Sequence, residues 1–266
     1  MTGDSYSTSE MMTVAAARRL RDGATCFVGI GLPSTAANLA RLTHAPRVSL
    51  IYESGTIGAK PSVLPLSIGD GELATSADTV VSTPEIFRYY LQAGRIDVGF
   101  LGAAQIDRFA NINTTVIGAY RKPTTRLPGA GGAPEIAAFA GEVLIIMQQS
   151  ARSFVERVDF VTSAGYLDGG DARKRAGLPG KGPVALITDL CIFEPDPVTR
   201  ELTVASIHPG VTRQAIEAAT GWPVRYGSQV AVTDTPKAAE LSALRELLQR
   251  TAAAHGPSAK RSSSPS

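Results

Sequence analysis

The chain is poor in the residues that build metal sites and disulfide frameworks. Its 266 residues include two cysteines and three histidines. Cys26 and Cys191 lie far apart, each within an apolar run, and their spacing fits neither a zinc site nor a disulfide framework. We therefore expect no metal site, and two reduced thiols that are buried as small hydrophobic side chains.

An excess of one charge and long apolar runs are also lacking. The 26 basic and 24 acidic residues nearly cancel, which leaves no electrostatic footprint for nucleic acid or for a membrane surface. No apolar stretch reaches membrane-spanning length, and the polar, acidic start of the chain does not read as a signal peptide. We expect a cytoplasmic protein with neither a nucleic-acid nor a membrane partner.

What the chain does contain is an alternation of apolar strands with helical segments. Residues 24–30, 34–42 and 47–52 read as strand, helix and strand, which is the signature of a parallel sheet. The same reasoning predicts helices at 9–20, 83–92 and 212–220, and strands at 97–101, 143–147, 184–193 and 202–207. The expected fold is α/β: one domain over residues 1–250, with a mostly parallel sheet and helices on both faces.

Two segments depart from this alternation. Residues 165–183 shift in composition to Gly, Asp, Lys and Pro, which predicts a long surface loop or a seam between lobes. The serine-rich end of the chain, residues 251–266, is predicted to be a disordered tail.

Glycine-rich turns follow several of the predicted strands. They lie at residues 29–33, 53–58 and 99–105, with a fourth glycine-rich stretch at 129–132. Ligands of parallel sheets bind beyond the carboxyl ends of the strands, so these turns are candidate binding segments. The first turn fits a dinucleotide fingerprint poorly, because Ser34 stands where the third glycine belongs. Glu53 ends an apolar strand, a position where a glutamate is often only solvated.

A series of short motifs resembles one family. The segment Glu53-Ser54-Gly55-Thr56-Ile57-Gly58 resembles the E-[SN]-G-x-x-G motif of class I coenzyme A transferases, in which the glutamate is the covalent nucleophile. Five other motifs of the family occur in this chain in the family's order. Residues 29–33 resemble G-[IL]-G-x-P, residues 101–107 resemble L-G-A-x-Q-V-D, and residues 129–133 resemble G-x-G-G-A. Residues 207–212 resemble H-P-G-V-T, and residues 220–221 resemble [ST]-G. The spelling is most similar to the β subunits of the glutaconate CoA-transferase branch. Glu135 departs from the family, which commonly has an aspartate there.

The resemblance implies a CoA-transferase/NagB-like fold and a β subunit that moves coenzyme A from an acyl-CoA to a small carboxylic acid, such as a di- or 3-oxo-carboxylic acid. It implies that Glu53 forms an acyl–glutamyl anhydride and then a glutamyl–CoA thioester, and that the Gly132 N–H is an oxyanion donor. No cofactor is permanently bound; coenzyme A is a substrate. The implied partner is a homologous α subunit, in an α2β2 or larger complex. The candidates for binding CoA or substrate are Gly31, Gly102, Ala103, Gln105 and Gly131.

Other interpretations stay open. An acyl-CoA hydrolase or decarboxylase of the same fold, as in steroid-ring or branched-acid catabolism, is the alternative, and retention of Glu53 favours transfer over it. A binding protein or a sugar-phosphate isomerase-like protein is disfavoured by the combination of Glu53 with the glycine turns. Polar residues near the third turn can equally satisfy turn backbone groups, and His208 is interpreted as a loop residue rather than a general base. Those polar residues are Gln105, Asp107, Asn111 and Asn113.

Overall fold

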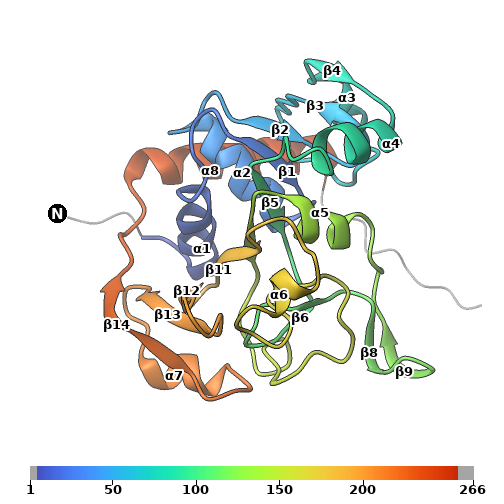
Figure 1. Ribbon diagram of the computed structural model, residues 1–266. Helices are drawn as coiled ribbons and strands as arrows, with labels where there is room; N and C mark the ends of the chain where they lie inside the picture. The colour runs from blue at the N-terminus through green and yellow to red at the C-terminus, as the bar shows by residue number, and fades with distance from the viewer. Residues whose placement is uncertain (1–4, 257–266) are drawn as a thin grey trace, which may run out of the picture.

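A computed structural model describes residues 5–256, and its main element is a ten-stranded sheet (Figure 1). The strands follow one another across the sheet in the order β14 (Arg225–Val232), β13 (Leu202–Ile207), β12 (Cys191–Pro195), β11 (Pro183–Ile187), β10 (Glu142–Ile146), β5 (Val98–Leu101), β1 (Thr25–Val28), β2 (Ser49–Ile51), β3 (Thr56–Ile57) and β4 (Thr79–Val80).

The centre of this sheet is parallel. Strands β11, β10, β5, β1 and β2 run in the same direction, so their carboxyl ends lie at one edge. On one side, β3 and β4 continue the sheet in antiparallel fashion; on the other side, β12 and β13 do so, and β14 lies parallel to β13. The mostly parallel sheet expected from the sequence is confirmed.

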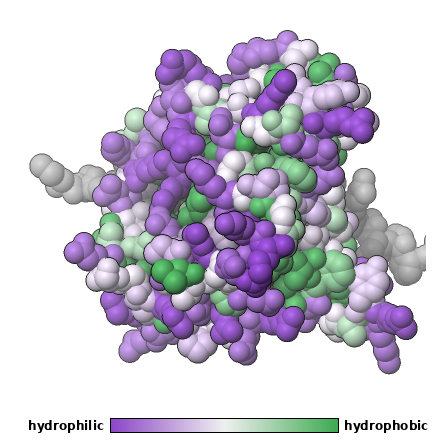
Figure 2. Space-filling view, in the orientation of Figure 1, coloured by the Kyte–Doolittle hydropathy of each residue, from purple (hydrophilic) through white to green (hydrophobic). Residues whose placement is uncertain are grey.

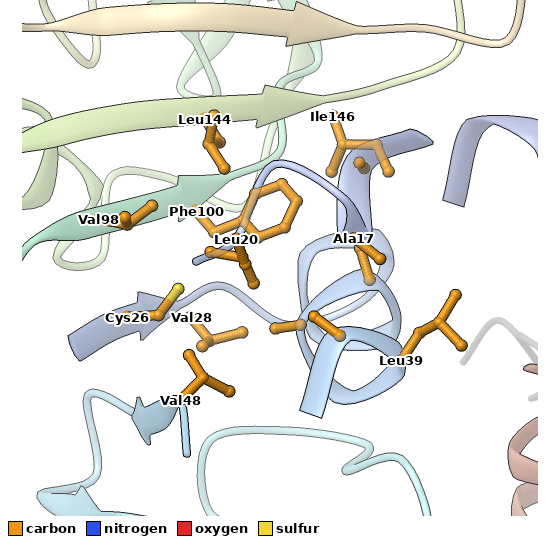
Figure 3. Packing of buried hydrophobic residues seen from close by; sticks show 14 of the residues in the cluster. Ala17, Leu20, Cys26, Val28, Leu39, Val48, Val98, Phe100, Leu144 and Ile146 are labelled. Carbon is orange, nitrogen blue, oxygen red and sulfur yellow. The ribbon is translucent and has the colours of Figure 1, made fainter. Parts of the chain in front are cut away.

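Both faces of the sheet are covered, because successive side chains of a strand point to opposite faces. On one face, α1 (Thr8–Ala17), α2 (Leu32–Leu42) and α8 (Ala238–His255) contact one another and enclose an apolar cluster. Figure 3 shows part of this cluster, with Phe100 of β5 lying beside Leu20. On the other face, η1 (Ile86–Leu91) and α5 (Ala133–Phe139) contribute to a second cluster. The expected single α/β domain with helices on both faces is confirmed.

The remaining elements are short and lie around the sheet. Two small hairpins pair β6 with β7 and β8 with β9, and the second of them projects from the body of the molecule (Figure 1). The bounds of these elements are α3 (Gly71–Thr75), α4 (Thr83–Glu85), β6 (Gln105–Ile106), β7 (Ile112–Asn113), β8 (Val116–Ala119), β9 (Lys122–Arg126), α6 (Ala172–Arg175) and α7 (Arg213–Ala218).

One expected strand was wrong, and one expected helix is present but is mostly of another type. Residues 184–193 are not one strand: β11 ends at Ile187 and β12 returns antiparallel from Cys191. The Thr188 hydroxyl accepts hydrogen bonds from the Leu190 and Cys191 N–H groups and so closes the turn between the strands. The helix expected at 83–92 begins at Thr83, but after one α-helical turn it continues as the π-helix η1.

The carboxyl-terminal helix α8, Ala238–His255, was not predicted from the sequence. Helix α8 continues to His255, so residues 251–255 are helical and not part of a disordered tail. The Thr251 hydroxyl accepts a hydrogen bond from the Leu64 N–H at 2.9 Å, which ties this end of the helix to the loop after β3. The rest of the expected tail, residues 257–266, lies outside the described residues.

Both cysteines lie in the part of the chain that the structure describes, residues 5–256. Cys26 and Cys191 are both buried and free, as the sequence predicted. Burial raises the pKa of the Cys191 thiol to about 12, so it stays protonated at neutral pH.

None of the described helices combines the length and the apolar character needed to cross a membrane. Polar residues dominate the face of the molecule seen in Figure 2, with apolar residues in smaller areas between them.

Candidate active site

Glu53 lies at the carboxyl end of β2, in a tight turn that leads back into β3. The turn is closed by hydrogen bonds from Gly55 N to Tyr52 O (3.0 Å) and from Tyr52 N to Thr56 O (3.1 Å). Gly55 adopts a φ of +94°, and a Cβ atom added there would lie 1.8 Å from the carbonyl oxygen of Val81. Only glycine fits this position, so the glycine that follows Glu53 in the motif serves to hold the turn against the chain at β4.

A second glycine turn meets the Glu53 carboxylate. The N–H of Gly132, at the start of α5, donates to Glu53 Oε1 at 2.6 Å, although the two residues are 79 positions apart in the chain. A Cβ atom on Gly132 would lie 2.4 Å from the same oxygen and 2.4 Å from Cζ of Phe87. The short contact therefore requires glycine at position 132. The predicted nucleophile and the predicted N–H donor are neighbours in the structure.

These residues border a cavity of about 520 Å³ that is apolar on one side. Ile68, Phe87 and Pro134 supply the apolar wall, next to the Glu53 carboxylate. Glu135 also lines the cavity, and its carboxylate accepts a hydrogen bond from Gln92 Nε2 at 3.3 Å. A carboxylate held by one N–H beside apolar side chains is suited to covalent chemistry on a carbonyl group. The full lining is Glu53, Ile68, Thr83, Phe87, Gly131, Gly132, Pro134 and Glu135.

A second cavity, of about 410 Å³, lies at the ends of β1, β5 and β10. Gly102 and Ala103 line it, together with residues from the turn after β1 and the segment after β10. Both cavities thus lie at the edge formed by the carboxyl ends of the parallel strands, where ligands of such sheets bind. The lining comprises Ile30, Leu32, Pro33, Gly102, Ala103, Ile146, Met147, Gln148, Ser150 and Ser153.

Gln105 and Gly31 do not join Glu53 in its cavity. The Gln105 side chain is buried, donates to Asp159 Oδ2 at 3.1 Å and accepts from Asn113 Nδ2 at 2.7 Å. The polar atoms of Gln105 therefore form hydrogen bonds within the protein. Gly31 is exposed and lies at the start of α2 with a φ of +86°.

The polar residues that follow Gln105 hold the backbone. Asp107 accepts hydrogen bonds from the N–H groups of Phe109 and Asn111, each at 3.0 Å, and Asn111 accepts from the N–H of Gly165. Burial raises the pKa of Asp107. These contacts support the interpretation in which this segment satisfies turn backbone groups.

His208 has a comparable structural position. Its two ring nitrogens contact Thr188 O at 2.8 Å and Thr233 Oγ1 at 3.0 Å, and its side chain is buried away from both cavities. Burial lowers the pKa of His208. The geometry agrees with a loop residue rather than a general base.

Sequence reasoning did not assign several residues to the Glu53 cavity, among them Ile68, Thr83, Phe87 and Pro134. Ile68 lies in an exposed loop, and Thr83 and Phe87 lie in the helical segment that follows β4. The Thr83 hydroxyl donates to the backbone oxygen of Glu53 at 3.2 Å. The capping sequence Ser82-Thr83-Pro84-Glu85 signals where this segment begins, but no pattern in the sequence shows that it faces Glu53. Over the described part of the chain, no group of His, Cys, Asp and Glu residues is arranged to hold a metal ion.

Most of the chain, including the site around Glu53, matches a known protein family. The family described as Coenzyme A transferase matches residues 9–219, which is most of the chain and includes both glycine turns at Glu53. The chain belongs to the coenzyme A transferase family. The expected enzyme class, a transferase, is therefore confirmed.

Relatives place the chain within the coenzyme A transferase family. It is 70% identical over 251 residues to the B subunit of the 3-oxoadipate CoA-transferase of Pseudomonas knackmussii, covering 94% of this chain and 96% of that protein. It is 34% identical to the B subunit of the glutaconate CoA-transferase of Acidaminococcus fermentans, covering 91% and 92% of the two chains. The crystal structure of glutaconate coenzyme A-transferase from that organism matches with a TM-score of 0.86 and 32% identity, over 93% of this chain and 96% of that one. The expected similarity to β subunits of this family is confirmed.

The alternative activity is not favoured. A cholesterol ring-cleaving hydrolase IpdB subunit of Mycobacterium tuberculosis covers 90% of this chain and 94% of that protein, but it is only 26% identical. The B subunits of the 3-oxoadipate and glutaconate CoA-transferases, at 70% and 34% identity, are both more similar in sequence to this chain than the hydrolase subunit is.

Proposed function

We propose that this chain is the β subunit of a CoA-transferase that acts on a 3-oxo dicarboxylic acid of the 3-oxoadipate type. The proposal is supported by the 70% identity to the corresponding subunit of a 3-oxoadipate CoA-transferase. The observation that carries the mechanism is the hydrogen bond of 2.6 Å from Gly132 N–H to Glu53 Oε1. It holds a carboxylate in one orientation at the mouth of an apolar-walled cavity.

In the first half-reaction, a Glu53 carboxylate oxygen attacks the thioester carbonyl carbon of the acyl-CoA donor. The carbon–sulfur bond breaks, CoA leaves as a thiolate, and an acyl–glutamyl anhydride remains. The thiolate then attacks Cδ of Glu53, which releases the donor acid as a carboxylate and leaves a glutamyl–CoA thioester. No water and no net proton are consumed, so the energy of the thioester is kept on the protein.

In the second half-reaction, the carboxylate of the acceptor acid attacks Cδ of Glu53 and displaces the CoA thiolate. The thiolate attacks the acceptor's acyl carbonyl in the new anhydride, which forms the product acyl-CoA and restores the Glu53 carboxylate. Each attack on Cδ places negative charge on the Glu53 oxygen that faces Gly132. The Gly132 N–H is therefore positioned for oxyanions that form on Glu53 itself, a contribution of roughly 100- to 1000-fold in rate.

The oxyanion that forms on the acyl carbonyl needs a different donor. We assign that donor to a homologous α subunit, which would also cover the cavity and exclude water. This matches a transferase built from two kinds of subunit in a hetero-oligomer. The cavity beside Gly102 and Ala103 is proposed to take the pantetheine end of CoA, with Gln105 holding the turn from beneath. Gly31 is proposed to lie where the turn before α2 borders that ligand, and Gly131 beside the reacting acyl group.

The test uses the complex obtained by co-expressing this chain with its α subunit. The wild-type complex should transfer CoA to 3-oxoadipate with ping-pong kinetics, and with lower kcat/KM to glutaconate. Glu53→Gln should abolish transfer and leave the fold intact, because the amide is nearly isosteric but a far weaker nucleophile. Treatment with acyl-CoA and then borohydride should modify Glu53 in the wild-type complex alone. Near-normal turnover by Glu53→Gln, or labelling only at a cysteine, overturns the mechanism.

A further inference from the structure

Arg173 is a buried cation inside the segment that the sequence marks as a surface loop. Its residue is 5% exposed, whereas the neighbouring Lys174 and Arg175 are exposed to solvent. Burial lowers the pKa of Arg173. A buried guanidinium is costly unless each of its N–H groups finds an acceptor, so its contacts indicate what it holds.

All five N–H groups of Arg173 are directed at backbone carbonyls. Nε donates to Gly180 O at 2.9 Å, and Nη1 donates to Ala164 O and Gly165 O at 3.1 and 3.0 Å. Nη2 donates to Ala137 O and Ala138 O at 2.6 and 3.3 Å. One side chain thus joins three separate stretches of backbone.

Two of these carbonyls belong to the last turn of α5, where helical carbonyls lack N–H partners within the helix. A cation is also favoured there by the helix dipole. The opposite end of the same helix begins at Gly132, whose N–H contacts Glu53. Helix α5 has seven residues, which corresponds to about 10 Å of rigid rod between the Arg173 contacts and the Glu53 contact.

We propose that Arg173 is a positioning residue for the reaction: by anchoring the carboxyl end of α5 it sets where the Gly132 N–H meets the Glu53 carboxylate. The inference rests on the proposed function of Glu53 and Gly132. Gly182 leaves space for the Arg173 side chain, because a Cβ atom at position 182 would lie 3.0 Å from Nε of Arg173. The anchor acts through α5 and touches neither substrate nor Glu53.

The experiment compares Arg173→Ala with Arg175→Ala in the co-expressed complex. Arg175 lies on the same short helix and forms an ion pair with Asp171, but it is exposed, so its variant is the matched control. Arg173→Ala should lower kcat by about 100-fold, because a displacement of about 1 Å at a reacting group costs that much. The KM for acyl-CoA should stay within about 3-fold, since uniform substrate binding is unchanged. Arg175→Ala should match the wild type.

Two further readouts separate positioning from general damage. The cavity of about 690 Å³ bordered by Arg173 opens to solvent, so added guanidinium can reach the space left by Arg173→Ala. Guanidinium in the millimolar range should restore kcat in Arg173→Ala and not alter Arg175→Ala, whereas sodium at equal ionic strength should not. Hydrogen exchange should be faster at the α5 amides in Arg173→Ala than in the wild type. Arg173→Lys keeps the charge but has three donors for five carbonyls, and should lose about 10-fold in kcat.

The outcomes distinguish the two proposals. A wild-type complex without transferase activity contradicts the proposed function, and the exchange of α5 amides then still reports on the anchor. If the wild type is active, a kcat within about 3-fold of it in Arg173→Ala or in Arg173→Lys overturns the positioning role. A change confined to KM, absence of rescue by guanidinium, or unchanged exchange at α5 also overturns it. If Arg173→Ala does not assemble, Arg173→Lys decides the question by its kcat and exchange.

Discussion

Replacing Gly132 by alanine adds one methyl group at the point where Glu53 is most closely held. The backbone at Gly132, with a φ of −86° and a ψ of 0°, accepts alanine without strain. The obstacle is space: the new Cβ would lie 2.4 Å from Glu53 Oε1 and 2.4 Å from Cζ of Phe87. Ordinary contacts begin near 3.4 Å, so either the carboxylate and the ring or the α5 terminus must move by about 1 Å.

That movement has separate effects on catalysis and on stability. Loss of the Gly132 N–H contact removes one oxyanion donor, which costs roughly 100- to 1000-fold in kcat. Misplacement of the carboxylate acts on the same step, so we expect Gly132→Ala to lose about 1000-fold. Overpacking against Phe87 should lower the free energy of unfolding by about 1–3 kcal/mol.

The assay measures kcat of the complex with its α subunit, alongside thermal unfolding of each variant. Gly131→Ala is the control: its added Cβ would lie 3.5 and 3.6 Å from the two Glu53 carboxylate oxygens, which is ordinary contact. Its φ of +49° costs about 1 kcal/mol for alanine, but the Gly132 donor is kept. Gly131→Ala should therefore lose stability and, because Gly131 is proposed to lie beside the acyl group, should raise the KM for acyl-CoA while its kcat falls far less than that of Gly132→Ala.

A double variant isolates the two contacts. Phe87→Ala alone loses the packing of the ring against Phe27 and the second cluster, so the comparison needs both single variants. Adding Phe87→Ala to Gly132→Ala removes the clash with the ring and leaves the conflict with Glu53, so the double variant should be less destabilised than the sum of the two single variants while kcat stays low. Full activity in a folded Gly132→Ala complex would refute the reasoning. Equal loss of activity in Gly131→Ala would also refute it, because the effect could then not be assigned to the Gly132 N–H.

Three further outcomes follow from the same contacts. Glu53→Asp should fail as a transferase, because the carboxylate is withdrawn by one methylene from Gly132, and should retain some thioester hydrolysis; acyl-CoA turnover with and without acceptor acid measures both. Gly55→Ala should unfold at a clearly lower temperature in a thermal melt, because its Cβ would lie 1.8 Å from Val81 O at a φ of +94°. The hydrogen bond and ion pair with Arg245 lower the pKa of Glu10 to about 2. The ionised Glu10 therefore stabilises the folded chain above the unfolded pKa of 4.5, and this contribution is lost as pH falls towards 2. Glu10→Gln should accordingly cost about 1 kcal/mol at pH 7 and progressively less as the pH falls from 4.5 towards 2, by denaturant titration at each pH.

Much of the candidate site could be located from the sequence, because its parts are strand ends and glycine turns. An apolar strand that ends in Glu53 and a glycine turn that precedes α5 are both local patterns, and parallel strands bring such ends to one edge. The contact between Glu53 and Gly132 spans 79 positions, and only the family resemblance suggested it beforehand. The role of Gln105 could not be predicted, because its burial depends on the pairing of β6 with β7, in which it faces Asn113.

The errors in the fold come from side-chain contacts that the sequence pattern does not reveal. The turn between β11 and β12 contains neither glycine nor proline and is closed instead by the Thr188 hydroxyl, so residues 184–193 read as one apolar strand. The buried state of Arg173 depends on carbonyls from three separate stretches of backbone, one of them 36 positions away, which a loop-like composition conceals. Sequence patterns report which residues favour a strand or a turn, but not which side chains another segment will enclose.

The π-helix η1 bears on how this site can change by insertion and deletion. In η1 the N–H of Gln92 bonds to the carbonyl of Phe87 at 2.8 Å, one residue farther along than in an α-helix. Each of these two kinds of hydrogen bond closes about one helical turn, so η1 accommodates one extra residue without turning the segments on either side of it. Deletion of one residue between 88 and 91 would restore α-helical spacing and leave Phe87 next to Gly132. Homologous chains with one residue fewer in this helix should therefore still have glycine at position 132.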